Sequence, residues 1–371
     1  MAIWKIDELG EFVTLKRGYD LPQQKRKNGE IPIFSSSGVT GTHNEAMVEA
    51  PGVITGRYGT IGEVFFAETS FWPLNTTLYV ENFHENDEKF VYYFLKTLEW
   101  KKFASASAVP GINRNTVHKE IVRFPDFETQ QKIASVLSTI DKKIAVNKAI
   151  NDNLEQQAAT YFQELFINNA NPVWQISTIS DLGTVVGGST PSKTKPEYYT
   201  NNGIAWITPK DLSINKSKFI SHGENDITEL GLKNSSATVM PKGTVLFSSR
   251  APIGYIAIAS NEVTTNQGFK SVIPYSEIGT AFVYFFLKHS LPVIESAASG
   301  STFKEISGSA MKNIPAIIPD RNTLDQFNSF CAPIFAQQKI LEEQNHSLAM
   351  LRDSLLPKLM SGAIDIASIQ L

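Results

Sequence analysis

Apolar side chains recur at alternating steps of four and three residues along one long stretch in the first half of the chain. This stretch runs from Glu128 to Asn168 without a proline or a glycine. Its seam positions are Ile133, Leu137, Ile140, Ile144, Asn147, Asn151, Leu154, Ala158, Tyr161 and Leu165. Because this spacing is the heptad pattern of a coiled coil, it predicts one long helix that packs on another helix.

The same pattern returns near the end of the chain. The second seam consists of Phe327, Cys331, Ile334, Gln338, Leu341, Asn345, Leu348, Arg352, Leu355 and Leu359. Pro333 interrupts it, so we expect Pro333 to kink the helix or to mark its true start. Pro357 and Gly362 stand where stop signals usually stand. Asn151 and Asn345 share one seam position, where a buried Asn would fix the register; exposure on a frayed stretch is the alternative.

Short runs of β-prone residues between turn signals precede each long helix. The predicted strands are Phe12–Leu15, Gly52–Thr55, Val64–Ala67, Thr77–Val80, Thr244–Ser248, Tyr255–Ala259 and Lys270–Ile273. Helical stretches at Glu88–Lys101 and Ile278–Ser290 lie among them. The pattern therefore predicts an α+β fold, with two mixed α/β domains and two long helices. Since neither apolar seam can be left in water, we expect the helices to form an antiparallel coiled coil.

An internal repeat relates the two halves. The segment Phe90–Lys96 (FVYYFLK) returns as Phe282–Lys288 (FVYFFLK). Further matches follow in the same order: Trp4 with Trp174, Arg57 with Arg250, Asn75 near Asn266, and Pro125-Asp126 with Pro319-Asp320. A repeat of this length predicts two similar domains with pseudo-two-fold symmetry. The predicted boundaries are 1–125 for the first domain, 126–170 for the first helix, 171–319 for the second domain, and 320–371 for the second helix and tail.

Composition narrows the class of protein further. The chain has 371 residues, of which 42% are hydrophobic and 19% charged, enough for two or three domains with real cores. The net charge of −3 counts mildly against a nucleic acid partner. No apolar run approaches 18 residues and the N-terminus lacks a signal-peptide core, so we expect a cytoplasmic protein without a membrane partner. One cysteine and six scattered histidines argue against a disulfide or a zinc site.

Recognisable catalytic motifs are missing from the sequence. We find no phosphate-binding loop of the Walker type, no dinucleotide fingerprint and no nucleophile elbow. The segment Asn171-Pro172-Val173-Trp174 lacks the pattern of an amino-methyltransferase motif. Asp126 and Asp320 are better explained as helix caps than as metal ligands, and Cys331 as a small apolar seam residue. We therefore predict a chain that is not an enzyme and carries no cofactor or metal.

Basic residues gather in early loops of each half. The first half has Lys16, Arg17, Lys25, Arg26 and Lys27, and the second has Lys193, Lys195, Lys210, Lys216 and Lys218. Such loops can form a phosphate-facing side on a protein of near-zero net charge. Plain solvated loops are the alternative.

Two short arginine loops are more specific candidates. Arg57 and Arg250 each follow an apolar strand and precede an Ile-Gly pair. The planar fork of an arginine suits guanine O6 and N7, or a phosphate. Polar loops at Ser105–Arg114 and Ser299–Lys304 stand at matching places, and their hydroxyl groups suit phosphate oxygens. The further candidate DNA contacts in these loops are Tyr58, Thr60, Ser107, Arg114, Ser248, Ser249, Ser301, Thr302 and Lys304.

Together these features resemble the DNA-specificity subunit of type I restriction-modification enzymes, over the whole chain. The resemblance rests on the Trp-x-Ile…Leu-Gly opening of each half, the Arg…Ile-Gly loops and the Ser/Thr-rich loops. It also rests on Thr129–Ala134 (TQQKIA) with Ile140-Asp141, and on Leu355–Gly362 (LLPKLMSG). Two departures are Pro333 and the ending of the first helix, which lacks a Leu-Leu-Pro segment.

The resemblance implies that each globular half is a target-recognition domain for one half of a split, asymmetric sequence in double-stranded DNA. It implies helices that act as a spacer and dock two methyltransferase subunits, with two restriction subunits in the full complex. Those partners would methylate adenine with S-adenosylmethionine, or translocate and cut DNA with ATP. The alternative from another class is a coiled-coil scaffold with duplicated protein-binding domains; a cryptic nuclease is a third.

Overall fold

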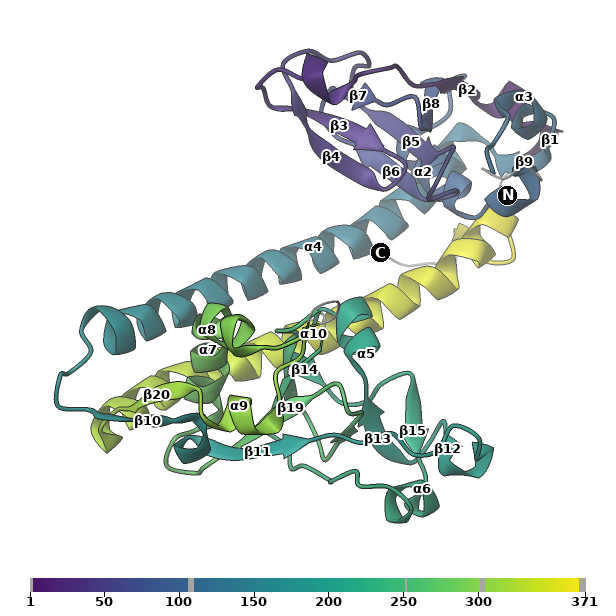
Figure 1. Ribbon diagram of the computed structural model, residues 1–371. Coiled ribbons are helices and arrows are strands. Elements are labelled where there is room, and N and C mark those ends of the chain that lie inside the picture. Colours follow the sequence, from purple (N-terminus) through teal and green to yellow (C-terminus); the bar gives the residue numbers. More distant parts are fainter. Residues whose placement is uncertain (1–2, 106–109, 251, 301–303, 367–371) are drawn as a thin grey trace. The chain divides into compact units, whose positions relative to one another are not determined.

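The computed structural model describes residues 3–105, 110–250, 252–300 and 304–366. The chain divides into two compact units (Figure 1). Unit 1 combines Met1–Ala145 with His346–Leu371, and unit 2 is Val146–Asn345. Two long helices, α4 (Phe127–Gln163) and α10 (Arg321–Ser361), each contribute residues to both units. The α+β class predicted from the sequence is confirmed.

Unit 1 holds three small sheets in its described part, drawn in purple and blue in Figure 1. A ribbon pairs β1 (Trp4–Glu8) with β9 (Ile121–Pro125). A second sheet has the order β2 (Thr14–Arg17), β8 (Thr77–Asn82), β5 (Gly52–Gly56), β6 (Val64–Ala67). The third is β4 (Gly38–His43), β3 (Ile31–Ser35), β7 (Trp72–Pro73). The helices are α1 (Leu9–Phe12), α2 (Glu88–Lys96) and α3 (Arg114–His118).

Helix α2 supplies much of the core of unit 1. Its sequence places Phe90, Val91 and Phe94 on buried positions, and Asp87 caps its first turn by accepting a hydrogen bond from the Phe90 backbone N–H at 2.7 Å. The predicted helix Glu88–Lys101 is too long, since α2 ends at Lys96. The predicted strand Phe12–Leu15 also starts too early, because Phe12 belongs to α1 and β2 begins at Thr14.

Unit 2 repeats this plan with longer insertions. Its ribbon pairs β10 (Gln175–Thr178) with β20 (Pro315–Ile318). A five-stranded sheet has the order β11 (Gly183–Gly187), β19 (Lys270–Pro274), β16 (Val245–Phe247), β17 (Ile256–Ala259), β14 (Phe219–Ile220). A smaller sheet is β12 (Tyr199–Thr200), β15 (Asn225–Ile227), β13 (Ile204–Ile207), β18 (Thr264–Thr265). The helices are α5 (Pro209–Ile214), α6 (Glu229–Lys233), α7 (Thr280–His289), α8 (Leu291–Ala297) and α9 (Gly308–Lys312).

The core of unit 2 joins its α+β domain to the long helices through aromatic rings. Phe282 and Phe285 of α7 lie 5.8 and 6.0 Å from the Phe162 ring of α4, between ring centroids. Phe327 of α10 lies 5.7 Å from the same ring. Helix α7 is apolar on nearly every face and correspondingly buried, as expected for a helix enclosed by other elements.

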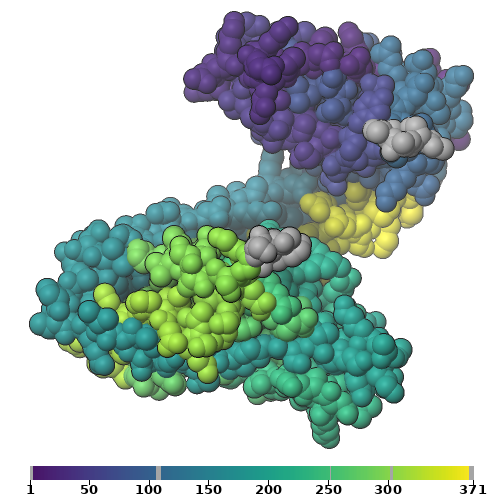
Figure 2. Space-filling model, viewed as in Figure 1, coloured from purple at the N-terminus to yellow at the C-terminus, as the bar shows by residue number. Residues whose placement is uncertain are grey.

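The long helices run antiparallel in each unit. In unit 1, Ile133 and Leu137 of α4 share a core with Leu359 and Met360 of α10. The last turns of α10, in yellow, lie against the blue surface of unit 1 (Figure 2). In unit 2, the Tyr161 ring of α4 lies 4.5 Å from that of Phe330. The predicted antiparallel pairing is therefore confirmed.

Pro333 does not mark the start of α10 and Pro357 does not end it, whereas a kink at Pro333 stays a prediction. The helix begins at Arg321, well before Pro333, so Pro333 does not mark its start, and it continues through Pro357 to Ser361. The neighbours Cys331 and Ile334 are buried in unit 2, and this tertiary packing outweighs the local cost of a proline. Gly362, with φ of +73°, ends the helix as predicted.

Several seam positions are polar, and hydrogen bonds connect some of them across the two helices. Asn147 is fully buried, and its Nδ2 donates to Asn345 Oδ1 at 3.0 Å and to Gln344 Oε1 at 3.3 Å. Asn345 therefore pairs with Asn147 across the helices, while the half-buried Asn151 accepts at its backbone oxygen from Gln338 Nε2 at 3.1 Å. The buried apolar seam residues are Ile133, Leu137, Ile140, Ala158, Phe327, Cys331, Ile334, Leu341 and Leu359; Ile144, Leu154, Tyr161, Leu165, Leu348 and Leu355 are half-buried.

Candidate nucleic-acid interface

Three loops of unit 1 meet around Arg57. The Arg57 backbone N–H donates to the Thr76 carbonyl oxygen at 2.8 Å. The Arg57 carbonyl oxygen accepts from the Ile112 N–H at 3.1 Å, and Tyr58 forms an isolated bridge with Gly111. The structure thus brings together the predicted arginine loop and the polar loop before α3.

Unit 2 builds the same arrangement from different residues. The Ser249 N–H donates to the Gly268 carbonyl oxygen at 2.7 Å, and the Ser249 carbonyl oxygen accepts from the Ile306 N–H at 3.0 Å. Arg250 forms an isolated bridge with Glu305. The internal repeat therefore extends to the way in which each arginine loop is held.

The side chain of Arg57 is anchored through one nitrogen. Its Nε donates to the Ile112 carbonyl oxygen at 3.1 Å, and its guanidinium lies 4.6 Å from the centroid of the Tyr58 ring. Within the described part of the chain, the side-chain hydrogen bond of Arg57 is made through Nε, and Nη1 and Nη2 make no hydrogen bond or ion pair to a described residue. A guanidinium held in this way presents its two terminal nitrogens as a fork for a bidentate partner.

Arg250 is anchored at the same nitrogen, but by a charge. Its Nε lies 2.9 Å from Glu305 Oε2, and Lys270 Nζ lies 3.8 Å from Glu305 Oε1. Burial lowers the pKa of Lys270, in opposition to the attraction of Glu305. The two loops therefore share a backbone arrangement, but Arg250 takes the place of Tyr58, one residue after the place of Arg57. The anchor also differs in charge, because it is a neutral carbonyl in unit 1 and a carboxylate in unit 2.

The serines beside Arg250 are not on the surface. Ser248 and Ser249 are fully buried. Ser248 Oγ donates to the Pro252 carbonyl oxygen at 2.9 Å and accepts from the Tyr255 N–H at 2.8 Å. Ser248 therefore shapes the loop that presents Arg250. The candidates Ser107, Ser301 and Thr302 lie outside the described residues.

The remaining basic candidates vary in how free their charges are. Lys16 pairs with Glu81, Arg17 Nη2 lies 3.4 Å from Asp20 Oδ1, Lys195 Nζ 3.8 Å from Glu197 Oε1, and Lys210 Nζ 2.6 Å from Glu224 Oε2. Arg26 Nη1 donates to the Thr40 carbonyl oxygen at 3.3 Å. The exposed candidates are Thr60, Lys25, Lys27, Arg114, Lys193, Lys216 and Lys304, with Tyr58 half-buried. Lys218, expected in a basic loop, is instead buried inside unit 2.

Two amide residues beside the arginines were not among the predicted contacts. Asn75 lies in the loop that holds Arg57, where its Nδ2 donates to Asp20. In unit 2, Gln267 occupies the loop that holds Ser249 and accepts from Thr190 Oγ1. In the sequence, these two loops are indicated by the match of Asn75 with Asn266 in the internal repeat.

Two searches of the described residues bear on other chemistry. No group of three His, Cys, Asp or Glu side chains there is placed to hold a metal ion. No described helix combines the length and the apolar character needed to cross a membrane. Asp126 Oδ1 accepts from the Thr129 N–H at 3.0 Å and Asp320 Oδ1 from the Thr323 N–H at 3.1 Å, so both aspartates are helix caps.

The described residues thus form two α+β units, each with the same three-loop arrangement, and two long helices contribute to both units. The family model described as "Type I restriction modification DNA specificity domain" matches residues 1–156 and 172–345, which is most of the chain. The chain therefore belongs to the type I restriction-modification specificity subunits, with two copies of the specificity domain.

Relatives agree with this assignment. The chain is 43% identical over 162 residues to the type I restriction enzyme MjaIX specificity subunit of Methanocaldococcus jannaschii, over 43% of this chain and only 37% of that subunit. It is 24% identical over 348 residues to the HindI specificity subunit of Haemophilus influenzae, covering 72% of this chain and 75% of that one. The crystal structure of the S subunit from M. genitalium has the same fold, with a TM-score of 0.65, 18% identity and 96% coverage of both chains.

Proposed function

We propose that the chain reads a bipartite, asymmetric sequence in double-stranded DNA, with one half-site for each unit. The observation that carries this proposal is the three-loop arrangement that occurs once in each unit around an arginine anchored at Nε. Because the anchor is the Ile112 carbonyl in unit 1 and the Glu305 carboxylate in unit 2, the two loops offer different chemistry to a base. Different half-sites follow.

The first half-site contact is an arginine fork. Nη1 and Nη2 of Arg57 suit the O6 and N7 acceptors of guanine in the major groove. In the second half, the Glu305 carboxylate beside Arg250 can accept a hydrogen bond from cytosine N4 while Arg250 faces an acceptor. Exposed cations such as Lys25, Lys27 and Lys193 supply phosphate contacts, which set position rather than sequence.

The helices dock two methyltransferase subunits in this proposal, one for each repeat, with two restriction subunits in the full complex and catalysis confined to those partners. Support comes from apolar side chains that the helices leave exposed. Val146 and Ile340 in unit 2, and Met350 and Leu351 in unit 1, are each between 48% and 61% exposed. Surface apolar groups of this size on a helix favour a partner helix.

The low overall charge fits such a division of labour. The net charge is −3, and several loop cations already have carboxylate partners. Much of the electrostatic attraction to the DNA backbone must then come from partner subunits, since nonspecific DNA affinity depends on cations that meet phosphates.

The test is selection from a random DNA library by the full chain in complex with a methyltransferase subunit. We expect an enriched motif of two short half-sites with a fixed gap, and weaker binding at higher salt. Methylome sequencing of cells that express the complex should return the same motif. Enrichment of no motif, together with DNA-independent assembly, would support the protein scaffold instead.

A further inference from the structure

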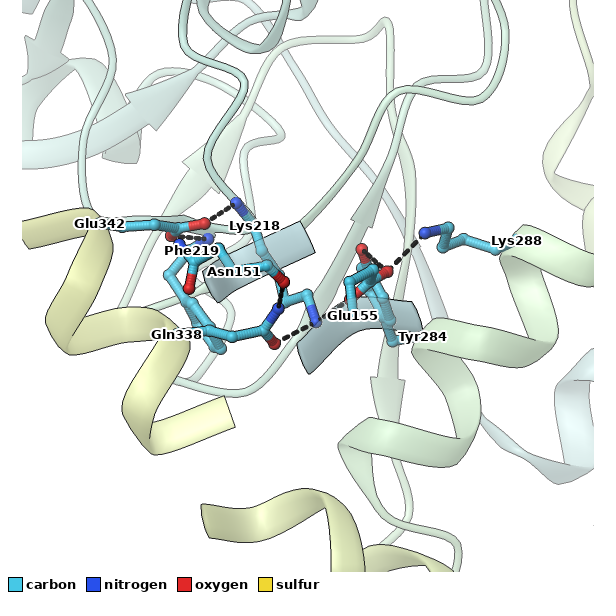
Figure 3. Close-up of polar contacts among 8 residues, drawn as sticks. All are labelled: Asn151, Glu155, Lys218, Phe219, Tyr284, Lys288, Gln338 and Glu342. Atoms are coloured by element: carbon cyan, nitrogen blue, oxygen red, sulfur yellow. Dashed lines mark hydrogen bonds and ion pairs between the residues drawn. The ribbon is translucent and has the colours of Figure 1, made fainter. Parts of the chain in front are cut away.

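Unit 2 buries a lysine where its recognition domain meets the long helices. The Lys218 side chain is only 6% exposed. Its Nζ pairs with Glu155 of α4 and donates to Gln338 Oε1 of α10 at 2.6 Å (Figure 3). The same nitrogen lies 4.1 Å from the centroid of the Phe335 ring. Burying a charge costs free energy unless the charge is paired. Displacing Lys218 from these partners would therefore be unfavourable.

The carboxylate of Glu155 gathers further groups from the recognition domain. Its Oε1 accepts from Lys288 Nζ at 2.5 Å and from the Tyr284 hydroxyl at 3.2 Å, both on α7 (Figure 3). Burial acts to raise the pKa of Glu155, but the charges of Lys218 and Lys288 outweigh it and hold that pKa below its ordinary value. Glu155 is therefore a carboxylate at neutral pH that ties α4 to two elements of the domain.

A second carboxylate closes the edge of the five-stranded sheet. Glu342 of α10 accepts from the Lys218 N–H at 2.7 Å and from the Phe219 N–H at 3.0 Å (Figure 3). Phe219 begins β14, which is the edge strand of that sheet. The sheet edge is thus fastened to the helix by two hydrogen bonds to a charged group, which are about twice as strong as neutral ones.

We propose that Lys218, with Glu155 and Glu342, is a positioning device that fixes the angle of the second recognition domain on the helices, and thereby sets the half-site spacing that the protein accepts. The inference rests on the proposed bipartite reading. Apolar packing alone tolerates small slides and rotations, whereas this network offers directional partners on α4, α10 and α7 at once. One lysine thus couples β14 to both helices.

Unit 1 contains an independent network of the same kind. The Tyr93 hydroxyl of α2 donates to Asp141 Oδ2 of α4 at 2.5 Å, and Arg352 Nη1 of α10 donates to Asp141 Oδ1 at 2.7 Å. Tyr93 belongs to the repeated segment Phe90–Lys96, as Tyr284 belongs to its copy. In both units, then, a tyrosine of the domain and a cation meet one carboxylate of α4.

Spacing is the property that separates positioning from plain stability. One added base pair moves a half-site by about 3.4 Å and rotates it by about 35° around the DNA axis. A domain held rigidly on the helices cannot adjust to this change, whereas a domain whose contacts with the helices are loosened can. A variant with a loosened joint should therefore lose discrimination between spacings, beyond any general loss of affinity.

The experiment measures binding of the full chain, in complex with methyltransferase subunits, to the selected target and to versions with one base pair added or removed. The variants are Lys218→Met, which keeps the apolar stem of the side chain and removes the charged end, and the double variant Lys218→Met/Glu155→Gln, which lowers the risk of an uncompensated charge. The matched control is Lys233→Met, at an exposed lysine of α6 in the same unit.

We expect Lys218→Met to reduce the preference for the natural spacing about tenfold, which corresponds to about 1.4 kcal/mol. The base preferences within each half-site should stay unchanged, and Lys233→Met should behave as the unmodified chain. Equal loss of affinity for all spacings, or no change in either Lys218 variant, would overturn the positioning role. Failure of the unmodified chain to prefer any spacing would instead refute the bipartite reading itself.

Discussion

Arg57 is the residue whose replacement tests the DNA-reading proposal most directly. Its Nε is occupied by the Ile112 carbonyl and its planar group stacks on Tyr58, so the terminal nitrogens are fixed in orientation before DNA arrives. A bidentate contact to a base contributes about 1–3 kcal/mol of discrimination. At 25 °C this corresponds to a factor of about 5 to 150 between the preferred base and the others.

The substitution Arg57→Lys separates shape from charge. Lysine keeps the positive charge but has no planar fork, so it contacts the acceptors of a guanine as a flexible point charge without the fixed orientation of arginine. Loss of the bond to the Ile112 carbonyl costs about 1 kcal/mol of stability, too little to unfold the domain. We therefore expect Arg57→Lys and Arg57→Ala to lose discrimination at one position of the first half-site, with the second half-site unaffected.

The assay is competition binding against targets that carry each of the four bases at every position, at two salt concentrations. Arg250→Ala serves as the reciprocal control and should alter the second half-site alone. If Arg57→Ala weakened all sequences equally and reduced the salt slope by about 1, Arg57 would be a phosphate contact and the base-reading argument would fail.

Three further predictions concern the contacts that α4 makes in unit 2. Asn147→Leu should lower the free energy of unfolding, measured in urea, by about 1–3 kcal/mol because it removes the partner of the Asn345 oxygen. The double change Asn147→Leu/Asn345→Leu should recover most of that loss. Strictly additive losses would contradict the pairing of the two side chains. Phe162→Ala, which empties a site among buried aromatic rings, should cost about 3–5 kcal/mol in the same measurement. The pKa of Glu155 is lower in the folded chain than its ordinary value of 4.5, so the ionised carboxylate stabilises the fold at pH values above 4.5. This contribution is lost as the pH falls through the pKa of the folded state. Glu155→Gln should therefore show a smaller drop in melting temperature between about pH 7 and about pH 4 than the unmodified chain, and an equal drop would refute the ionic role.

The long helices and the duplication could be predicted because their signals are periodic and extend over many residues. A heptad seam needs no knowledge of distant neighbours, and the copied segment at Phe282–Lys288 directly indicates a second α2-like helix. The prolines of α10 misled the prediction because their cost is local. Packing around Cys331 and Ile334 outweighs that cost, and it appears only in the folded chain.

The site could be predicted only in outline. The two arginine loops stand out in the sequence, and the structure shows each of them joined to its polar loop. The burial of Lys218 could not be foreseen, because the surrounding residues read as an ordinary polar loop. Its environment depends on Glu155, Gln338 and Glu342, which lie at least 60 residues away along the chain. The bond from Arg57 to the Ile112 carbonyl spans 55 residues of the chain and also forms only on folding.

Unit 1 is built from two stretches that lie far apart in the chain, and this has a consequence for its synthesis on the ribosome. Leu137 emerges from the ribosome about 220 residues before Leu359, the neighbour that helps to cover it. At a rate of synthesis of roughly 5–20 residues per second, about 10–40 s pass before the residues of α10 that pack against early α4 are made. Unit 2 is contiguous and completes its own contacts first. The unit whose synthesis begins first is thus the last to be completed, and during that interval the apolar face of early α4 lacks the side chains that α10 adds to its core.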